Sequence, residues 1–284
     1  MDAASLVKLL NVTALAVVMM TIGLTVTFAQ VLTAAQRLRT VLLACLANFV
    51  LVPLVTVALL LAFEAAPLVA AGFLILAVCP GAPVAPTFTA LARGDVPSAT
   101  GLMAILAGLS AVLAPALLTL ALAWLAPASD LHIDFLAVVT TLLVSQLLPL
   151  FLGLAVHQWA PRLGARLARP CGIVGNLLLL AAVALIVATQ YPLLGAIRLR
   201  GWVGMAALLA ASLGIGWLCG GPEQAGRRAL AVTTGVRNAA VGLVIVAANF
   251  ADTPAVTAVV AYALVSIFGT LAFALAVGKR SIAP

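Results

Sequence analysis

Long uncharged runs, each rich in aliphatic residues, follow one another along almost the whole chain. Residues 40–63, 96–129 and 170–197 contain no acidic or basic side chain. Only 7% of all residues are charged and 65% are hydrophobic, whereas a soluble domain has about 25% charged residues. Because so few charges cannot cover a water-soluble fold, the lipid bilayer must be the solvent for most of the chain. The composition therefore excludes nucleic-acid-binding modules and small disulfide scaffolds.

The number of membrane spans follows from where charges and Gly/Pro clusters interrupt these runs, since a spanning helix needs about 20 apolar residues. The predicted spans are residues 8–32, 40–63, 67–92, 96–125, 133–158, 170–190, 201–220, 224–250 and 255–278. The chain is thus predicted to be an all-α polytopic membrane protein with nine transmembrane helices. We expect one membrane domain over residues 1–284, in the cell membrane, which is the inner membrane if the source is bacterial.

Basic residues predict the orientation, because cytoplasmic loops are enriched in Lys and Arg. One predicted face carries Arg37, Arg39, Arg93, Arg162, Arg166, Arg169, Arg227, Arg228, Lys279 and Arg280. The other face carries only Lys8, Arg198 and Arg200. We therefore expect the N-terminus outside and the C-terminus in the cytoplasm. Arg237 is the one basic residue that falls at no membrane edge.

Two spans contain residues that break or polarise a membrane helix. In residues 67–92, a cluster of prolines precedes two threonines, and because proline lacks a backbone donor, this density predicts a helix break. The residues of interest there are Pro80, Gly81, Pro83, Pro86 and Thr87, with residues 80–86 expected to be non-helical. In residues 224–250, the centre of the span is polar, and the residues of interest are Thr233, Thr234, Gly235, Arg237 and Asn238. A kinked but continuous second helix is the alternative reading.

The two interrupted spans occupy matching positions in two sets of four spans. Residues 8–126 form a first predicted repeat, residues 133–158 an extra helix, and residues 170–278 a second repeat of inverted topology. The interrupted span is the third helix in each repeat. Inverted repeats with broken helices that cross at mid-membrane are typical of secondary transporters, whose site lies at the repeat interface.

Three segments resemble the signatures of the bile acid:sodium symporter family. CPGAPVAPTFTALARGDV (79–96) is similar to that family's CPGG turn followed by LARGD. TTGVRNAAVGLVIVAANF (233–250) is similar to its second signature, Glu-x-Gly-x-Gln-Asn before a small-residue helix. MTIGLTVTFAQV (20–31) resembles a third short stretch of the family, of the form GLTL followed by an acidic or polar residue. The resemblance implies the nine-helix form of the family, in which a panel of helices packs against a core that contains the two crossing helices.

The sodium-binding positions of that family are largely not matched here. Ala85 and Pro86 replace a Ser-Asn pair, Thr233 stands at the Glu position and Arg237 at the Gln position. Gly235 and Asn238 are kept, and Asn48 resembles the amide on the family's second helix of the core. Since sodium prefers several oxygen ligands including a carboxylate, we expect no bound cofactor or metal and doubt a sodium site.

We expect a non-enzymatic secondary transporter of a small organic anion that works by alternating access, with Arg237 in place of sodium. Placing a guanidinium at the middle of a membrane costs at least about 2.5 kcal/mol of insertion free energy. The single arginine at this depth is therefore predicted to have a functional role. The alternatives are a sodium-coupled symporter with backbone ligands, an arsenite-permease-like carrier that uses Cys79, and a non-transporting membrane sensor. The expected partners are an anionic small molecule and the lipid bilayer, and no nucleic acid. Substrate identity, coupling, direction and oligomeric state stay open.

Overall fold

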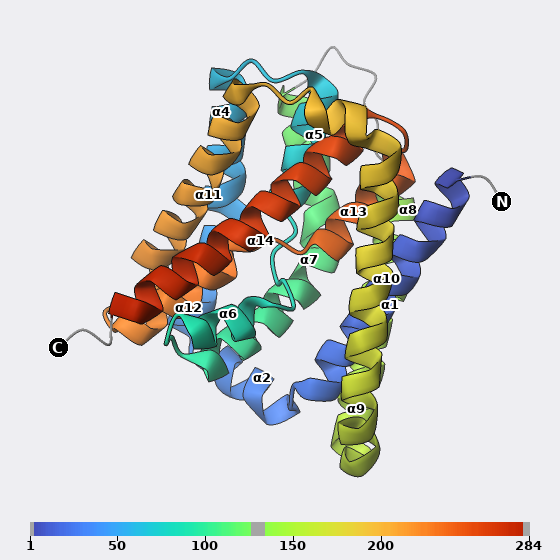
Figure 1. The fold of residues 1–284 in the computed structure, drawn as a ribbon. Coiled ribbons are helices and arrows are strands. Elements are labelled where there is room, and N and C mark those ends of the chain that lie inside the picture. Colours follow the sequence, from blue (N-terminus) through green and yellow to red (C-terminus); the bar gives the residue numbers. More distant parts are fainter. Residues whose placement is uncertain (1–2, 126–133, 281–284) are drawn as a thin grey trace.

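A computed structural model describes residues 3–125 and 134–280, and all regular elements in these ranges are helical (Figure 1). The elements are α1 (Ala3–Thr25), α2 (Phe28–Gln36), α3 (Leu38–Cys45), η1 (Leu46–Leu51), α4 (Val52–Ala62), α5 (Pro67–Ala77), α6 (Ala85–Leu91), α7 (Val96–Leu125), α8 (Phe135–Leu142), η2 (Leu143–Leu147), α9 (Leu148–Trp159), α10 (Pro161–Gly195), α11 (Leu199–Cys219), α12 (Gln224–Gly235), α13 (Ala239–Asn249) and α14 (Pro254–Arg280). The predicted end of the first repeat, residue 126, and the predicted start of the extra helix, residue 133, lie outside the described residues.

Eight helical stretches in the described residues are long and apolar enough to cross a membrane. They are Leu6–Thr25, Leu38–Ala62, Val96–Trp124, Phe135–Trp159, Pro161–Gly195, Leu199–Cys219, Gln224–Asn249 and Pro254–Lys279. The remaining predicted span, residues 67–92, consists of two short helices, α5 and α6, joined by an irregular segment. The chain is therefore a helical multi-pass membrane protein.

The helices form two groups that pack side by side (Figure 1). The side bundle consists of α1, α8 to α9, and α10; within it α1 packs against α9 and α10, whereas α8 packs against α7 and α13 of the central bundle. The central bundle consists of α3 to α4, α5, α6, α7 and α11 to α14. The short helix α2 connects the two groups at the lower end of Figure 1 and packs on α7.

The first predicted span, residues 8–32, was wrong at its C-terminal end. The long helix α1 ends at Thr25, and α2 starts separately at Phe28. The reason is a capping box, in which the Thr27 hydroxyl accepts from the Gln30 backbone nitrogen at 3.1 Å and the Gln30 side chain accepts from the Thr27 nitrogen at 2.9 Å. The span predicted over residues 170–190 is also too short, because α10 starts at Pro161 and continues through Pro170.

Two membrane helices contain a short π-helical segment, and each segment carries one buried amide. Asn48 lies in η1 and Gln146 in η2, both fully buried. A proline follows each segment, Pro53 in the first turn of α4 and Pro149 in the first turn of α9. Wide π turns accommodate the missing N–H of a proline and often occur at functional positions.

Basic residues are divided between the two ends of the molecule as the sequence predicted. The junctions α2–α3, α6–α7, α9–α10 and α11–α12 and the end of α14 lie at the lower end in Figure 1. These places carry most of the arginines. The junction α10–α11, with Arg198 and Arg200, lies at the upper end.

Candidate functional site at the crossing of two broken helices

The first helix break separates α5 from α6 over residues 78–84. The sequence predicted residues 80–86, and this range was wrong for Ala85 and Pro86, which already belong to α6. Proline is well tolerated in a first helical turn, because the N–H it lacks has no helical partner there. Gly81 in this break has φ +82°, and a Cβ there would lie 2.5 Å from the Ala107 backbone nitrogen, so only glycine fits.

The second break lies between α12 and α13, at residues 236–238. The helix is thus interrupted rather than merely kinked. Asn238 begins α13, and its side chain accepts from the Val241 backbone nitrogen at 3.3 Å, which is a standard N-terminal cap.

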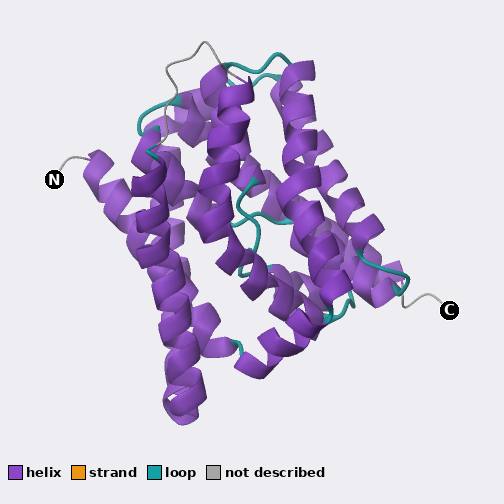
Figure 2. Cartoon of the chain, turned by 180° about the vertical axis from the view of Figure 1, so that it is seen from behind, coloured by secondary structure: helices purple, strands orange, loops and turns teal. Residues whose placement is uncertain are grey.

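The two breaks are directly hydrogen-bonded to each other, and Figure 2 shows the two loops meeting near the centre of the molecule. The Asn238 backbone nitrogen donates to the Cys79 carbonyl at 2.9 Å. The Asn238 side chain donates to the Gly81 carbonyl at 3.2 Å. Because irregular backbone in a membrane needs internal partners, each break satisfies polar groups of the other.

Arg237 holds three segments together at this crossing. One guanidinium nitrogen donates to the Asn48 side-chain oxygen at 3.2 Å and to the Ala77 carbonyl at 3.3 Å. The other terminal nitrogen donates to the Thr234 carbonyl at 2.6 Å. The side chain is only 1% exposed. Its partners belong to η1, to the end of α5 and to the end of α12, so one side chain connects α12 to two elements at least 160 residues earlier in the sequence.

The electrostatics of the crossing favour a cation at this position. Ala77 is the last residue of α5, and Thr234 lies in the last turn of α12. Free carbonyls at a helix C-terminus carry roughly half a negative charge, so two such ends amount to about one. Among the described residues, the one ion pair is Arg37 with Asp95, and Arg237 therefore has backbone and amide oxygens in place of a carboxylate.

Asn48 and Thr234 complete the network. The Asn48 side-chain nitrogen donates to the Thr234 hydroxyl at 3.2 Å and to the Ala44 carbonyl at 2.9 Å. Both side chains are fully buried. Asn48 thus accepts from Arg237 and donates to Thr234, which leaves the amide one defined orientation.

Gln146, in the other π segment, fixes the far side of the first break. Its side-chain nitrogen donates to the Ala107 carbonyl and to the Ser110 hydroxyl, the latter at 3.1 Å. Ala107 is the residue of α7 against which Gly81 packs. The side bundle is therefore linked to the central bundle immediately behind the break. The sequence signal for this role was an amide in the middle of an apolar span.

A cavity of about 430 Å³ lies between the side bundle and the central bundle, next to the first break. This volume is within the usual range of small-molecule sites. Its walls come from α1, α2, the break before α6, α6 itself, α7 and α10. The polar lining residues are Thr21, Thr25, Gln30, Thr87, Thr100 and Asn176.

A second, smaller cavity of about 60 Å³ lies between the same two bundles at the opposite end of α1. Asn11 lines it and is 1% exposed, and neither atom of its amide has a hydrogen-bond partner among the described residues. Thr189, Gln190 and Asp252 line the same space. A buried amide without partners is costly, so this cavity suits water or another polar guest.

The predicted site residues fall into three groups. Asn48, Gly81, Thr234, Arg237 and Asn238 are joined by hydrogen bonds at the crossing. Pro83, Pro86 and Thr87 line the large cavity. Pro80, Thr233 and Gly235 line neither cavity: the Thr233 hydroxyl donates to Ala229 in its own helix at 2.8 Å, and a Cβ on Gly235 would lie 2.5 Å from Leu213.

Two broken helices that are hydrogen-bonded to each other beside a polar cavity are typical of membrane transporters. The family model for the Sodium Bile acid symporter family matches residues 12–197. Because this is more than half of the chain, the protein belongs to the sodium bile acid symporter family of transporters. The match ends in the region of α10–α11, before the second break. A search of curated proteins returned no match.

Proposed function

We propose that this protein is a non-enzymatic secondary transporter of a small organic anion, with the Arg237 guanidinium in the place of a bound sodium ion. The observation that carries the proposal is the set of oxygens around Arg237, namely two carbonyls from the ends of α5 and α12 and one amide oxygen. In transporters with broken helices, unwound carbonyls and C-terminal helix ends of this kind coordinate sodium. A side-chain cation on the same oxygens makes the ion unnecessary.

The charge at the crossing supports the same proposal. The family resemblance implies one carboxylate and two sodium ions, a net charge of about +1. Here Thr233 stands in place of the carboxylate and Arg237 supplies the cation, which again gives +1. Arg suits the position because its planar fork bonds several oxygens at once and stays protonated.

Alternating access would operate between the two bundles. At one end of this interface lies the 430 Å³ cavity with its polar walls, and at the other end lie the 60 Å³ cavity around Asn11 and an apolar cavity of about 240 Å³ between α10 and the central bundle. We infer that the structure represents a state open toward the end rich in basic residues, which the positive-inside rule assigns to the cytoplasm. The N-terminus is then outside, and Asn11 belongs to the closed outer half of the pathway.

Nine spans in two inverted repeats complete the proposal. The predicted repeats, residues 8–126 and 170–278, each include a broken third helix, α5–α6 and α12–α13, and α8 to α9 correspond to the predicted extra helix. The side bundle corresponds to the panel and the central bundle to the core that the resemblance implies. Thr87 in the first turn of α6 lines the cavity, where its hydroxyl could donate to an anionic substrate.

The test is uptake of labelled bile acids, other carboxylates and sulfonates into proteoliposomes, with sodium, proton and counter-substrate gradients imposed separately. Asn176→Leu, which changes a polar wall of the cavity, should weaken uptake at low substrate concentration. Asn249→Leu is the matched control, because among the described residues the Asn249 side chain bonds only its own helix, and it lines neither cavity. If the two variants reduce uptake equally, the 430 Å³ cavity is not the substrate site. If no anion is taken up, the proposed function as an anion transporter is wrong.

A further inference from the structure

Two apolar cavities meet beneath a pair of arginines at the upper end of the molecule. The first, of about 250 Å³, lies between α4, α5 and α11, and the second, of about 240 Å³, lies between α5, α10, α11 and α14. They share Val69, Phe73 and Gly201, so they are adjoining chambers. Neither shares a residue with the 430 Å³ cavity of the candidate site.

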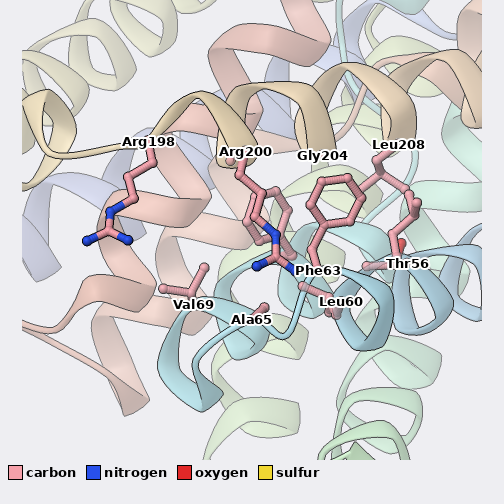
Figure 3. Close-up of a pocket in the computed structure, with 12 residues that line it drawn as sticks. Thr56, Leu60, Phe63, Ala65, Val69, Arg198, Arg200, Gly204 and Leu208 are labelled. Carbon is pink, nitrogen blue, oxygen red and sulfur yellow. The ribbon is translucent and has the colours of Figure 1, made fainter.

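Both arginines line the first chamber, and Figure 3 shows Arg200 extending toward Phe63 and Arg198 extending away from it. The Arg200 guanidinium lies 5.6 Å from the centroid of the Phe63 ring and donates to the Ala62 carbonyl at 3.3 Å. Arg198 begins α11, and its side chain has no hydrogen bond or ion pair among the described residues. Both side chains are exposed. The chamber therefore offers one free guanidinium and one that is held in place by an aromatic ring.

The first chamber is about two-thirds as deep as the hydrocarbon region of one leaflet. Its walls run along α4 from Phe63 to Thr56, which at 1.5 Å per residue is about 10 Å, and on α11 from Arg200 to Leu208. Half of a hydrocarbon core is about 15 Å. The arginines, at the helix ends, thus lie at headgroup level, and the apolar walls extend toward the middle of the membrane.

We propose that this place binds an anionic diacyl phospholipid, with the phosphate on Arg198 and Arg200 and one acyl chain in each chamber. Guanidinium groups bind phosphate well, because their planar set of donors matches the geometry of the phosphate oxygens. Arg198 and Arg200 are two of the three basic residues predicted at this end of the molecule, with Lys8 the third, and both line the first chamber. Glu64, next to Phe63, is the nearby opposing charge and reduces the attraction.

The binding is tested on the purified full-length protein by native mass spectrometry from detergent. Phosphatidylglycerol and phosphatidylcholine with identical acyl chains are titrated, with glycerol 3-phosphate as the headgroup without chains. We expect about a tenfold preference for phosphatidylglycerol, and no retention of glycerol 3-phosphate. Arg198→Gln with Arg200→Gln should abolish the preference, whereas Arg162→Gln with Arg166→Gln, an equal loss of charge at the other end, should keep it.

Two further variants separate the headgroup from the chains. Gly204→Leu should fill the first chamber, because a Cβ on Gly204 already lies 3.7 Å from the Phe63 ring, and should lower retention of both lipids. Glu64→Gln should strengthen the preference for phosphatidylglycerol. An equal affinity for the two lipids, a preference that survives in the Arg198/Arg200 variant, or displacement of the lipid by a soluble bile acid would overturn the proposal.

Discussion

The Arg237 guanidinium donates to the side-chain oxygen of Asn48 at 3.2 Å, across 189 residues of sequence and in the fully buried centre of the molecule. Asn48 in turn donates to Thr234, so the amide connects the end of α12 to the second helix break. This relationship joins the π segment of the second membrane helix to the crossing of α5–α6 with α12–α13. The stability and the transport cycle of the protein are expected to depend on it.

Replacing Arg237 should affect stability and transport together. Arg237→Gln removes the donors to Ala77 and Thr234, and a buried carbonyl without a partner costs about 1–3 kcal/mol. We expect a lower melting temperature in detergent and loss of anion binding. Arg237→Lys keeps the positive charge but loses the planar set of guanidinium donors. Its melting temperature and anion binding should lie between those of the wild type and those of Arg237→Gln. Arg166→Gln, an exposed arginine near the start of α10, is the control and should leave both readouts unchanged.

A sodium dependence should be created by exchanging two residues. Thr233→Glu with Arg237→Gln places a carboxylate and an amide at the positions where the family resemblance implies sodium ligands. Sodium, compared with potassium at equal ionic strength, should then raise the melting temperature of the double variant and not that of the wild type. Thr233→Glu alone still contains Arg237, and sodium should not raise its melting temperature. A higher melting temperature of this single variant in sodium would contradict the idea that the guanidinium and the ion compete for one place.

Restoring helicity at the first break should stop transport without preventing insertion. Pro80→Ala with Pro83→Ala removes two of the prolines that keep residues 78–84 irregular. Membrane fractionation should find normal amounts of protein, and proteoliposomes should show no uptake. Pro97→Ala, in the first turn of α7, serves as the control because proline is dispensable there. Full uptake by the double variant would mean that the break is not required.

A single methyl group at Gly81 should destabilise the protein. The added Cβ would lie 2.5 Å from the Ala107 nitrogen, and the φ of +82° disfavours any residue with a side chain. We expect Gly81→Ala to lower the free energy of unfolding by about 1–3 kcal/mol. Gly195→Ala meets nothing within 4 Å and should be neutral or slightly stabilising. Equal melting temperatures for the two variants would show that α7 can move away from the break.

The sequence predicted the two breaks because their causes are local. Proline density marks the first, and the polar run from Thr233 to Asn238 marks the second. The boundary errors also have local causes that the hydropathy pattern hides. The Thr27–Gln30 capping box divides one apolar run into two helices, and Pro86 is compatible with the first turn of α6.

The partners of Arg237 could not be predicted from its neighbours in sequence. Two of its three acceptors, Asn48 and Ala77, are at least 160 residues away, and they come together only because the helices cross. The π segments that point Asn48 and Gln146 inward leave no hydropathy signal beyond an amide and a nearby proline. The same holds for the two apolar chambers near Arg198 and Arg200, whose walls come from several helices.

The most direct test of the role of Arg237 is the sodium dependence of uptake by the wild-type protein. Purified protein in proteoliposomes is given a labelled anion that it transports, with either sodium or potassium outside at equal ionic strength and with membrane potential clamped. Arg237 in place of the ion predicts equal initial rates in the two salts. A steep, saturable increase in rate with sodium would contradict this role and would assign the coupling to sodium held by backbone carbonyls.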